Sequence, residues 1–241
     1  MIRFISAVFT ALFVPVFFVL FEMALLLVFL SRIFGSRVRI AVTHFCYLIF
    51  SRALVWTTLS RVEVIGDGYL PEDEPYVIYS NHSSFYDIPI ISGFLDHKAA
   101  YAARASLIKG LFGVWVLLGD GVLLEQKGTK QELRNILKIV GKVRTGRPFV
   151  VFPEGTRTRD GRVGALKAGS LKIASKAGAK LVPVRIEGSR DLLARGAKWP
   201  YPAQIRIIIA RPVNPEEILL YPDKVQEGLS AFFQGKRETV I

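Results

Sequence analysis

The sequence contains few of the residues that bind metals or form covalent cross-links. Cys46 is the only cysteine, so no intrachain disulfide can form. The three histidines stand at positions 44, 82 and 97, and none belongs to a cysteine–histidine cluster with metal-ligand spacing. We therefore expect no metal site and no bound cofactor. His44 and His97 lie outside the motifs described below, and we interpret both as structural or interfacial.

Acidic residues are scarce relative to basic ones, with 20 Asp and Glu against 32 Lys and Arg and a net charge of +12. A basic chain fits nucleic acid, an anionic membrane surface or an anionic soluble substrate. No nucleic-acid module or aromatic-basic stacking surface is recognisable, and the basic residues are dispersed. Because they accompany a long apolar segment, we expect anionic lipid or an anionic substrate as the partner and no nucleic acid.

Charge is absent from most of the N-terminal segment. No charged residue occurs from Phe4 to Phe21, and after Glu22 the apolar run resumes as far as Leu30. As a helix, this run is long enough to cross a hydrocarbon core of about 30 Å. It far exceeds the apolar region of a secretory signal, and no small-residue cleavage site precedes Ser31. We expect the segment to stay attached.

A second apolar stretch, Ile40–Phe50, follows three arginines. Pro15 and Glu22 interrupt the first stretch, so two linked helices lying within one leaflet fit the pattern about as well as a single span. The arginines after Leu30 favour a cytoplasmic position for the rest of the chain. We therefore divide the sequence into membrane-anchoring helices at 1–58 and a second domain at 59–241.

Beyond residue 60, short apolar runs alternate with helical patterns. Strands are expected at Val62–Ile65, Tyr76–Tyr79, Ala99–Ala103, Gly121–Leu124, Phe149–Phe152, Leu181–Ile186 and Ile205–Ile209. Helices are expected at Asp87–Leu95, around Leu133–Val140 and at Ala168–Lys176. The alternation predicts an α/β fold whose mixed, mainly parallel sheet is flanked by helices on both faces. Pro183 indicates an edge strand or a bulge for the run that contains it.

Four apolar residues recur at the spacing of one side of a helix: Leu133, Ile136, Leu137 and Val140. This spacing predicts that they form the apolar side of an amphipathic helix.

The segment Ser80-Asn81-His82-Ser83-Ser84-Phe85-Tyr86-Asp87 places a histidine and an aspartate five positions apart, just after an expected strand. Histidine has an unperturbed pKa near neutrality, and a carboxylate at one ring nitrogen leaves the other free to accept a proton. Such a pair has no nucleophile of its own and suits activation of a substrate hydroxyl. The alternative is a solvated hydrogen-bonded pair in an ordinary loop.

A second motif, Phe152-Pro153-Glu154-Gly155-Thr156-Arg157-Thr158, follows a buried strand. Gly155 permits close backbone approach, and Arg157 supplies a planar group suited to phosphate. Glu154 could orient the arginine or accept a bond from a substrate hydroxyl. An ordinary strand-to-loop turn is the alternative. Because both motifs follow strands of one sheet, they could face one crevice, where a base and an anion site would serve transfer to a phosphorylated substrate.

The two motifs in this order resemble the glycerolipid acyltransferase family, and within it the bacterial 1-acyl-sn-glycerol-3-phosphate acyltransferases. The resemblance covers roughly residues 60–190. It implies the glycerol-3-phosphate acyltransferase-like fold, a place in phospholipid biosynthesis, and a bacterial inner-membrane location with the catalytic domain on the cytoplasmic face. It also implies that a fatty acyl group passes from acyl-CoA or acyl carrier protein to the sn-2 hydroxyl of lysophosphatidic acid.

The resemblance also implies roles for particular residues. His82 would deprotonate the acceptor hydroxyl, and Asp87 would orient His82. Glycerol phosphate would be held by Glu154, Gly155, Thr156 and Arg157, with Arg104 as a second cation and Lys167 as a further basic residue. The acyl donor would be a substrate and not a cofactor, and the N-terminal helices would place the site where a lysolipid lies.

Two departures from the family pattern leave the acceptor open. Ala103-Arg104-Ala105-Ser106-Leu107 stands where the family commonly has a Lys-x-Glu-Leu segment, so arginine replaces lysine and serine replaces glutamate. Val182-Pro183-Val184-Arg185-Ile186-Glu187-Gly188 also resembles the acyltransferase domain of 2-acyl-glycerophosphoethanolamine acyltransferases. Another lysolipid is therefore the alternative acceptor. A catalytically silent membrane protein that presents a basic surface to lipid or to an acidic carrier is the alternative of another class.

Overall fold

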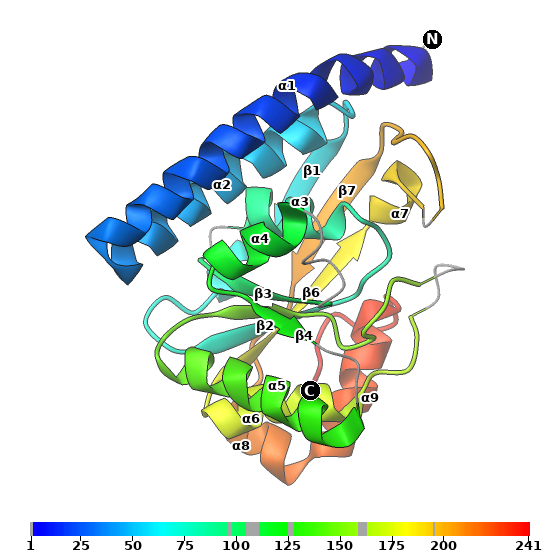
Figure 1. Cartoon of the computed structure of the whole chain (residues 1–241). Coiled ribbons are helices and arrows are strands. Elements are labelled where there is room, and N and C mark those ends of the chain that lie inside the picture. Colours follow the sequence, from blue (N-terminus) through cyan, green and yellow to red (C-terminus); the bar gives the residue numbers. More distant parts are fainter. Residues whose placement is uncertain (1, 96–97, 105–110, 125–127, 159–162, 195) are drawn as a thin grey trace.

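The computed structural model describes residues 2–95, 98–104, 111–124, 128–158, 163–194 and 196–241. Within these ranges the chain forms a seven-stranded sheet in the order β1-β7-β6-β2-β5-β3-β4 (Figure 1). The strands are β1 (Arg61–Ile65), β2 (Tyr76–Ser80), β3 (Ala100–Arg104), β4 (Val122–Leu124), β5 (Phe149–Val151), β6 (Lys180–Glu187) and β7 (Gln204–Ile209). Neighbouring strands are parallel except for the antiparallel pair β6–β7. The predicted mixed, mainly parallel sheet is confirmed.

Helices cover both faces of this sheet, as predicted (Figure 1). One face carries α1 (Ile2–Leu30), α2 (Ser36–Trp56), α3 (Asp87–Phe94) and α4 (Leu111–Leu118). The other carries α5 (Gly128–Arg144), α6 (Ala168–Ala177), α8 (Pro215–Leu220) and α9 (Pro222–Phe233), while the short α7 (Ser189–Leu192) follows β6. Two short 3₁₀ helices lie at Ser31–Phe34 and Asp67–Tyr69. All five residues of β2 are buried, because helices cover both faces of this interior strand. Burial on both faces accounts for the nearly continuous apolar sequence of the strand.

The amphipathic helix α5 is present, but the prediction of its apolar side is wrong in part. The side chains that enter the core are Ile139, Val140 and Val143, and Ile136 packs against them. Leu133 and Leu137 remain 50% and 49% exposed. The side of α5 that packs on the sheet is therefore rotated by about one residue from the side that carries the two leucines. Leu133 and Leu137 are left on the outer surface.

Pro183 lies in β6, an interior strand, so the expectation of an edge position is wrong. The bulge part of that expectation agrees with the structure. The ladder from β6 to β7 is interrupted between the Leu181–Val213 bridge and the Val184–Ile209 pair. Pro183 accepts a bond from the backbone N–H of Ala210 at 3.0 Å, so its side of the strand faces β7. The missing N–H of proline therefore falls where the ladder is already broken.

The N-terminal segment forms two helices that run side by side (Figure 1). Helix α1 continues through Pro15, and α2 ends at Trp56, shortly before β1 begins at Arg61. The pair is joined to the rest by an aromatic cluster in which Trp115 lies 4.8 Å from Phe21 and 5.3 Å from Tyr47, between ring centroids. Helix α2 also packs tightly on α3, where a Cβ at Gly93 would lie 3.0 Å from the backbone nitrogen of Arg52.

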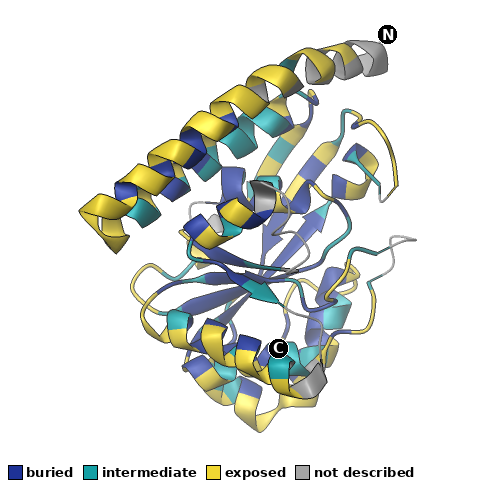
Figure 2. Ribbon diagram, in the orientation of Figure 1, coloured by how far each residue is buried: buried dark blue, intermediate teal, exposed yellow. Residues whose placement is uncertain are grey.

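Much of the surface of α1 that points away from the domain is exposed (Figure 2). Its exposed large side chains include Leu12, Val16, Phe18, Val19, Met23, Leu26, Leu27 and Phe29. Among the described residues, one helix, Ser36–Trp56, is long and apolar enough to cross a membrane by length and composition. A surface of this size and character indicates association with a membrane.

Candidate active site

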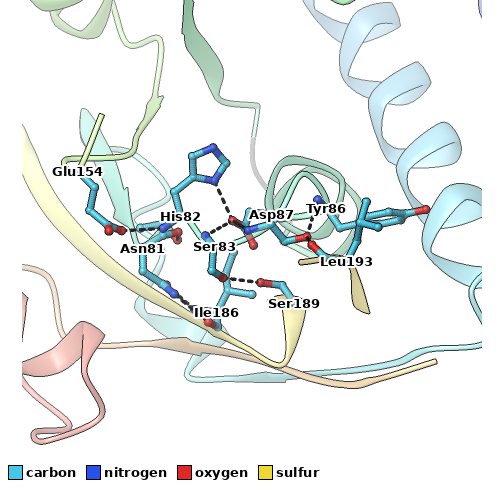
Figure 3. Close-up of polar contacts among 11 residues, drawn as sticks. Asn81, His82, Ser83, Tyr86, Asp87, Glu154, Ile186, Ser189 and Leu193 are labelled. Carbon is cyan, nitrogen blue, oxygen red and sulfur yellow. Dashed lines mark hydrogen bonds and ion pairs between the residues drawn. The ribbon is translucent and has the colours of Figure 1, made fainter. Parts of the chain in front are cut away.

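The histidine and aspartate of the first motif meet in space. Asp87 is the first residue of α3 and is fully buried, and its Oδ2 lies 2.8 Å from Nδ1 of His82 (Figure 3). The same oxygen accepts the backbone N–H groups of Ser83 and Ser84 at 2.7 and 2.8 Å. Three bonds on one oxygen fix the carboxylate, so it holds the imidazole ring with Nε2 turned away from the helix.

The His82 ring is also held from its face. It stacks on Phe152 with ring centroids 4.1 Å apart and an interplanar angle of 21°. The side chain is 16% exposed, so the ring is enclosed on most sides but still reachable. A ring fixed by a carboxylate at one nitrogen and by a stacked phenyl group can act as a base at its other nitrogen.

Hydrogen bonds join the segment from Asn81 to Ser84 to the end of β6 and to α7 and the residue that follows it. Asn81 forms two hydrogen bonds with the backbone of Ile186: its Nδ2 donates to the carbonyl oxygen at 2.9 Å, and its Oδ1 accepts the N–H at 2.8 Å. Ser83 and Ser189 share a hydroxyl–hydroxyl bond of 3.0 Å, and Ser84 donates to the carbonyl of Leu193 at 2.8 Å. These polar residues therefore set the position of the loop.

The second motif contacts the first directly. Glu154 is buried, and its Oε1 accepts the backbone N–H of His82 at 2.9 Å while its Oε2 accepts that of Gly164 at 2.9 Å (Figure 3). The backbone N–H of Thr158 donates to the carbonyl of His82 at 2.9 Å. Burial raises the pKa of the Glu154 carboxyl, and the N–H donors of Gly164 and His82 oppose that shift.

Gly155 shows why this loop requires glycine. Its φ is +69°, and an added Cβ would lie 2.7 Å from Cε and 2.8 Å from Nζ of Lys167. Lys167 is exposed, and its backbone N–H donates a hydrogen bond to the carbonyl of Pro153 at 2.9 Å. Its ammonium group therefore lies over the turn of the second motif. Beside it, Thr156 is exposed and Arg157 is half-buried.

The sixth predicted binding residue, Arg104, ends β3 next to β5, and its side chain lies outside the described residues, as does all of Ser106. The backbone of Arg104 is nevertheless at the same edge of the sheet as both motifs. The structure therefore brings the His82–Asp87 pair and the second motif together beyond the ends of β2 and β5. Asn81 and Phe152 were not predicted as site residues, although both stand inside the quoted motifs.

Topology explains why the site forms here. Strands β2 and β5 are parallel neighbours, so the loops that follow them leave the same edge of the sheet. The chain passes from β2 through α3 to β3 on one face, and from β5 through α6 to β6 on the other face. Connections that diverge to opposite faces open a crevice between two strand ends, where α/β proteins bind ligands.

An apolar cavity of about 160 Å³ lies beside the first motif. Phe85, Ile88 and Pro89 contribute to its wall from the end of the His82 loop and the start of α3. Helices α1, α2 and α4 and strand β3 also line it, with residues that include Phe21, Tyr47, Phe50, Leu54, Tyr101, Ala103 and Trp115. The cavity can take an aliphatic chain beside the loop that leads from His82 to α3.

Comparison with known proteins decides the family. The Acyltransferase family model matches residues 61–187, which is more than half of the chain and contains both motifs. The chain belongs to the Acyltransferase family. The solved structure of the 1-acyl-sn-glycerophosphate (LPA) acyltransferase PlsC from Thermotoga maritima superposes on it with a TM-score of 0.82, covering 97% of this chain and 94% of that one at 26% identity.

Curated proteins of the same family agree. The chain is 27% identical over 194 residues to the 1-acyl-sn-glycerol-3-phosphate acyltransferase of Pseudomonas aeruginosa, which covers 76% of this chain and 70% of the relative. It is 26% identical over 159 residues to a 1-acyl-sn-glycerol-3-phosphate acyltransferase of Chlamydomonas reinhardtii, covering 65% of this chain and 48% of that protein. The chain thus spans about half the length of the algal member of the Acyltransferase family that it matches.

Proposed function

We propose that the chain is a 1-acyl-sn-glycerol-3-phosphate O-acyltransferase. It transfers a fatty acyl group from a thioester, either acyl-CoA or acyl carrier protein, to the sn-2 hydroxyl of lysophosphatidic acid and produces phosphatidic acid for phospholipid biosynthesis. The observation that carries the proposal is the contact between the two motifs: the His82–Asp87 pair and the Glu154–Arg157 loop share one crevice at the ends of β2 and β5.

The reaction follows from that geometry. Nε2 of His82 takes the proton of the acceptor hydroxyl as its oxygen attacks the thioester carbonyl, and Asp87 stabilises the imidazolium that forms. The carbon–oxygen bond forms, the carbon–sulfur bond breaks, and the departing sulfur takes the proton back from His82. The products are an ester and a free thiol, and His82 returns to its neutral form.

The acceptor's phosphate would lie at the second motif. Lys167 places an ammonium group over Gly155, and Arg157 and Thr156 follow in the same turn. Arg104 ends the neighbouring strand β3 and would add a further cation. Phosphate favours arginine and lysine donors, and the surplus of positive charge along the chain would attract anionic lipids.

We propose that α1 and α2 attach the domain to the bacterial inner membrane, with the site on the cytoplasmic side. Their exposed apolar side chains support attachment to a membrane, and Arg32, Arg37 and Arg39 favour the cytoplasmic side. A lysolipid in the adjoining leaflet would then need to move only its headgroup towards His82. Interfacial helices of this kind bury one apolar side in the acyl region of the membrane.

The test of this function is a panel of acceptors and donors. Purified protein is incubated with radiolabelled acyl-CoA or acyl carrier protein and with lysophosphatidic acid, lysophosphatidylethanolamine or lysophosphatidylglycerol in neutral vesicles. We expect lysophosphatidic acid to be the preferred acceptor, because the second motif provides a cationic site. Preference for lysophosphatidylethanolamine would contradict the headgroup assignment, and no transfer to any lysolipid would favour the silent binding protein.

The cavity gives a second prediction under this function. Ala103 lines it from β3, so Ala103→Leu is expected to shorten the acyl chain that the enzyme prefers. Filling the space of two methylene groups should lower the rate with the longest accepted chain by about tenfold, since each buried methylene contributes ~0.8 kcal/mol. The measurement is a series of initial rates with acyl-CoA donors of increasing chain length.

Ala102→Leu is the matched control, because Ala102 precedes Ala103 in β3 and packs against the core on the other face of the sheet. Its chain-length profile should keep the wild-type optimum. If both variants kept that optimum, the cavity would not hold the acyl chain.

A further inference from the structure

Helices α5 and α6 carry an unusual share of the positive charge. Between them they contain seven lysines and arginines, and the one acidic residue in their sequences is Glu132. Of the seven, Lys142 is paired with Asp120 at 2.6 Å. The other six are exposed: Lys130, Arg134, Lys138, Arg144, Lys172 and Lys176. Among the described residues, none of these six forms an ion pair with a carboxylate.

Two exposed leucines lie among these cations. Leu133 and Leu137 stand on the outer side of α5, beside Arg134 and Lys138, and each is about half exposed. We call the six cations together with Leu133 and Leu137 the basic face. A surface with apolar residues at its centre and charges around them has the composition of a protein–protein interface.

The basic face begins near the site and runs away from it. Helix α5 starts four residues after the last residue of β4, and α6 starts directly after Lys167, so both helices begin at the edge of the sheet that holds His82. They end at the opposite edge, where Arg144 donates to the carbonyl of Lys176 at 2.6 Å. At 1.5 Å per residue, α5 is about 25 Å long, which is far more than a nucleotide would need.

The basic face is also turned away from the membrane helices. Helices α5 and α6 cover one face of the sheet, and α1 and α2 lie over the other (Figure 1). A membrane that receives the apolar side of α1 therefore lies across the sheet from the basic face. The partner of the basic face must come from the aqueous side.

We propose that the basic face docks an acyl carrier protein: a small acidic protein that brings the acyl group as a thioester on a flexible arm. This inference rests on the proposed acyltransferase function and names the donor's binding surface. The negative charge of such a carrier complements the six exposed cations, and Leu133 and Leu137 offer an apolar contact among them. From there, the arm would reach the crevice at the start of α5 and α6.

The experiment compares two donors on one variant. Arg134→Glu/Lys138→Glu reverses the charge beside Leu137 without touching the site, and transfer to lysophosphatidic acid is measured in neutral phosphatidylcholine vesicles. We expect kcat/KM with the acyl carrier protein donor to fall by about tenfold or more, because like charges then face each other, while kcat/KM with acyl-CoA stays within about twofold. A milder variant, Arg134→Gln/Lys138→Gln, covers the case in which charge reversal impairs folding.

Lys224→Glu/Lys236→Glu is the matched control, since both lysines are exposed and the net charge changes equally. It should leave both donors unaffected. An equal loss with both donors, or no loss with either, would overturn the docking site. A loss of binding to phosphatidylglycerol vesicles without a change in carrier use would overturn it in favour of lipid.

The two proposals fail in different ways. If wild-type protein uses acyl-CoA but not the carrier, the function stands and the docking site is wrong. If wild-type protein transfers nothing from either donor, the function is wrong, and direct binding of the carrier to wild-type and charge-reversed protein still tests the surface.

Discussion

His82→Ala is expected to lower acyl transfer by more than about a hundredfold, because loss of a positioned general base typically costs that much. Without the imidazole, the acceptor hydroxyl must lose its proton to water, while the thioester and phosphate contacts remain. The variant should therefore bind vesicles normally, since α1 and α2 are untouched. Initial rates with radiolabelled acyl-CoA and vesicle sedimentation measure the two properties separately.

His44→Ala is the matched control, because His44 is a histidine of α2 that lies outside the motif. Its rate should stay within about twofold of wild type, the usual scatter for a residue that takes no part in proton transfer. Near-normal turnover by His82→Ala would show that the base lies elsewhere. If the variant lost both turnover and vesicle binding, the result would instead indicate a damaged fold.

Glu154→Gln is expected to lower kcat by about ten- to a hundredfold and to leave KM for lysophosphatidic acid nearly unchanged, since small displacements of a reacting group have effects of this size. Both carboxylate oxygens accept backbone N–H groups, one of them from His82. Glutamine can accept only one of these bonds, and its own NH₂ group would face the other donor. The expected result is a displaced His82 backbone and a less effective base.

The KM and kcat values distinguish this positioning role from substrate binding. If Glu154 held the acceptor's hydroxyl or phosphate region, as the family resemblance implies, the variant would raise KM and leave kcat nearly intact. Glu154→Asp is the charge-preserving comparison, and its shorter side chain should fail to span both N–H groups. A KM effect without a kcat effect would contradict the positioning role.

Stability adds a second readout for the same variant. Burial raises the folded-state pKa of Glu154 above its unfolded value, so its contribution to stability falls as pH rises through the unfolded and then the folded pKa. The neutral glutamine removes this cost above the folded pKa but loses one bond. We therefore expect the free energy of unfolding at neutral pH to change by no more than about 1–2 kcal/mol. Thermal unfolding at several pH values checks this.

Much of the fold could be predicted because buried strands between helices leave a strong pattern. The continuous apolar runs at Tyr76–Tyr79 and Phe149–Phe152 identify strands covered on both faces, and those two strands support the site. The error at α5 has a physical cause. A helix with leucines on two sides offers more than one apolar face, and the sheet's position decides which one is buried.

The site was predictable to the level of its residue types and not of its contacts. His82, Asp87 and Glu154 stand in recognisable motifs, but Glu154 meets a backbone N–H of His82 only because β2 and β5 are adjacent. The bond between Asn81 and Ile186 joins residues 105 positions apart, a pairing set by strand order. Local sequence carries no signal for such long-range choices.

The cavity beside the first motif changes how the N-terminal helices should be regarded. Tyr47, Phe50 and Leu54 of α2 form part of its wall, together with Phe85 and Ala103 of the α/β domain. The N-terminal helices therefore do more than attach the domain to a membrane, because they also form part of this cavity. Removing residues 1–58 to gain solubility, or exchanging them for another anchor, would also remove one wall of this cavity. If the cavity holds the acyl chain, as we propose, such a change would alter the chain-length preference as well as the membrane attachment.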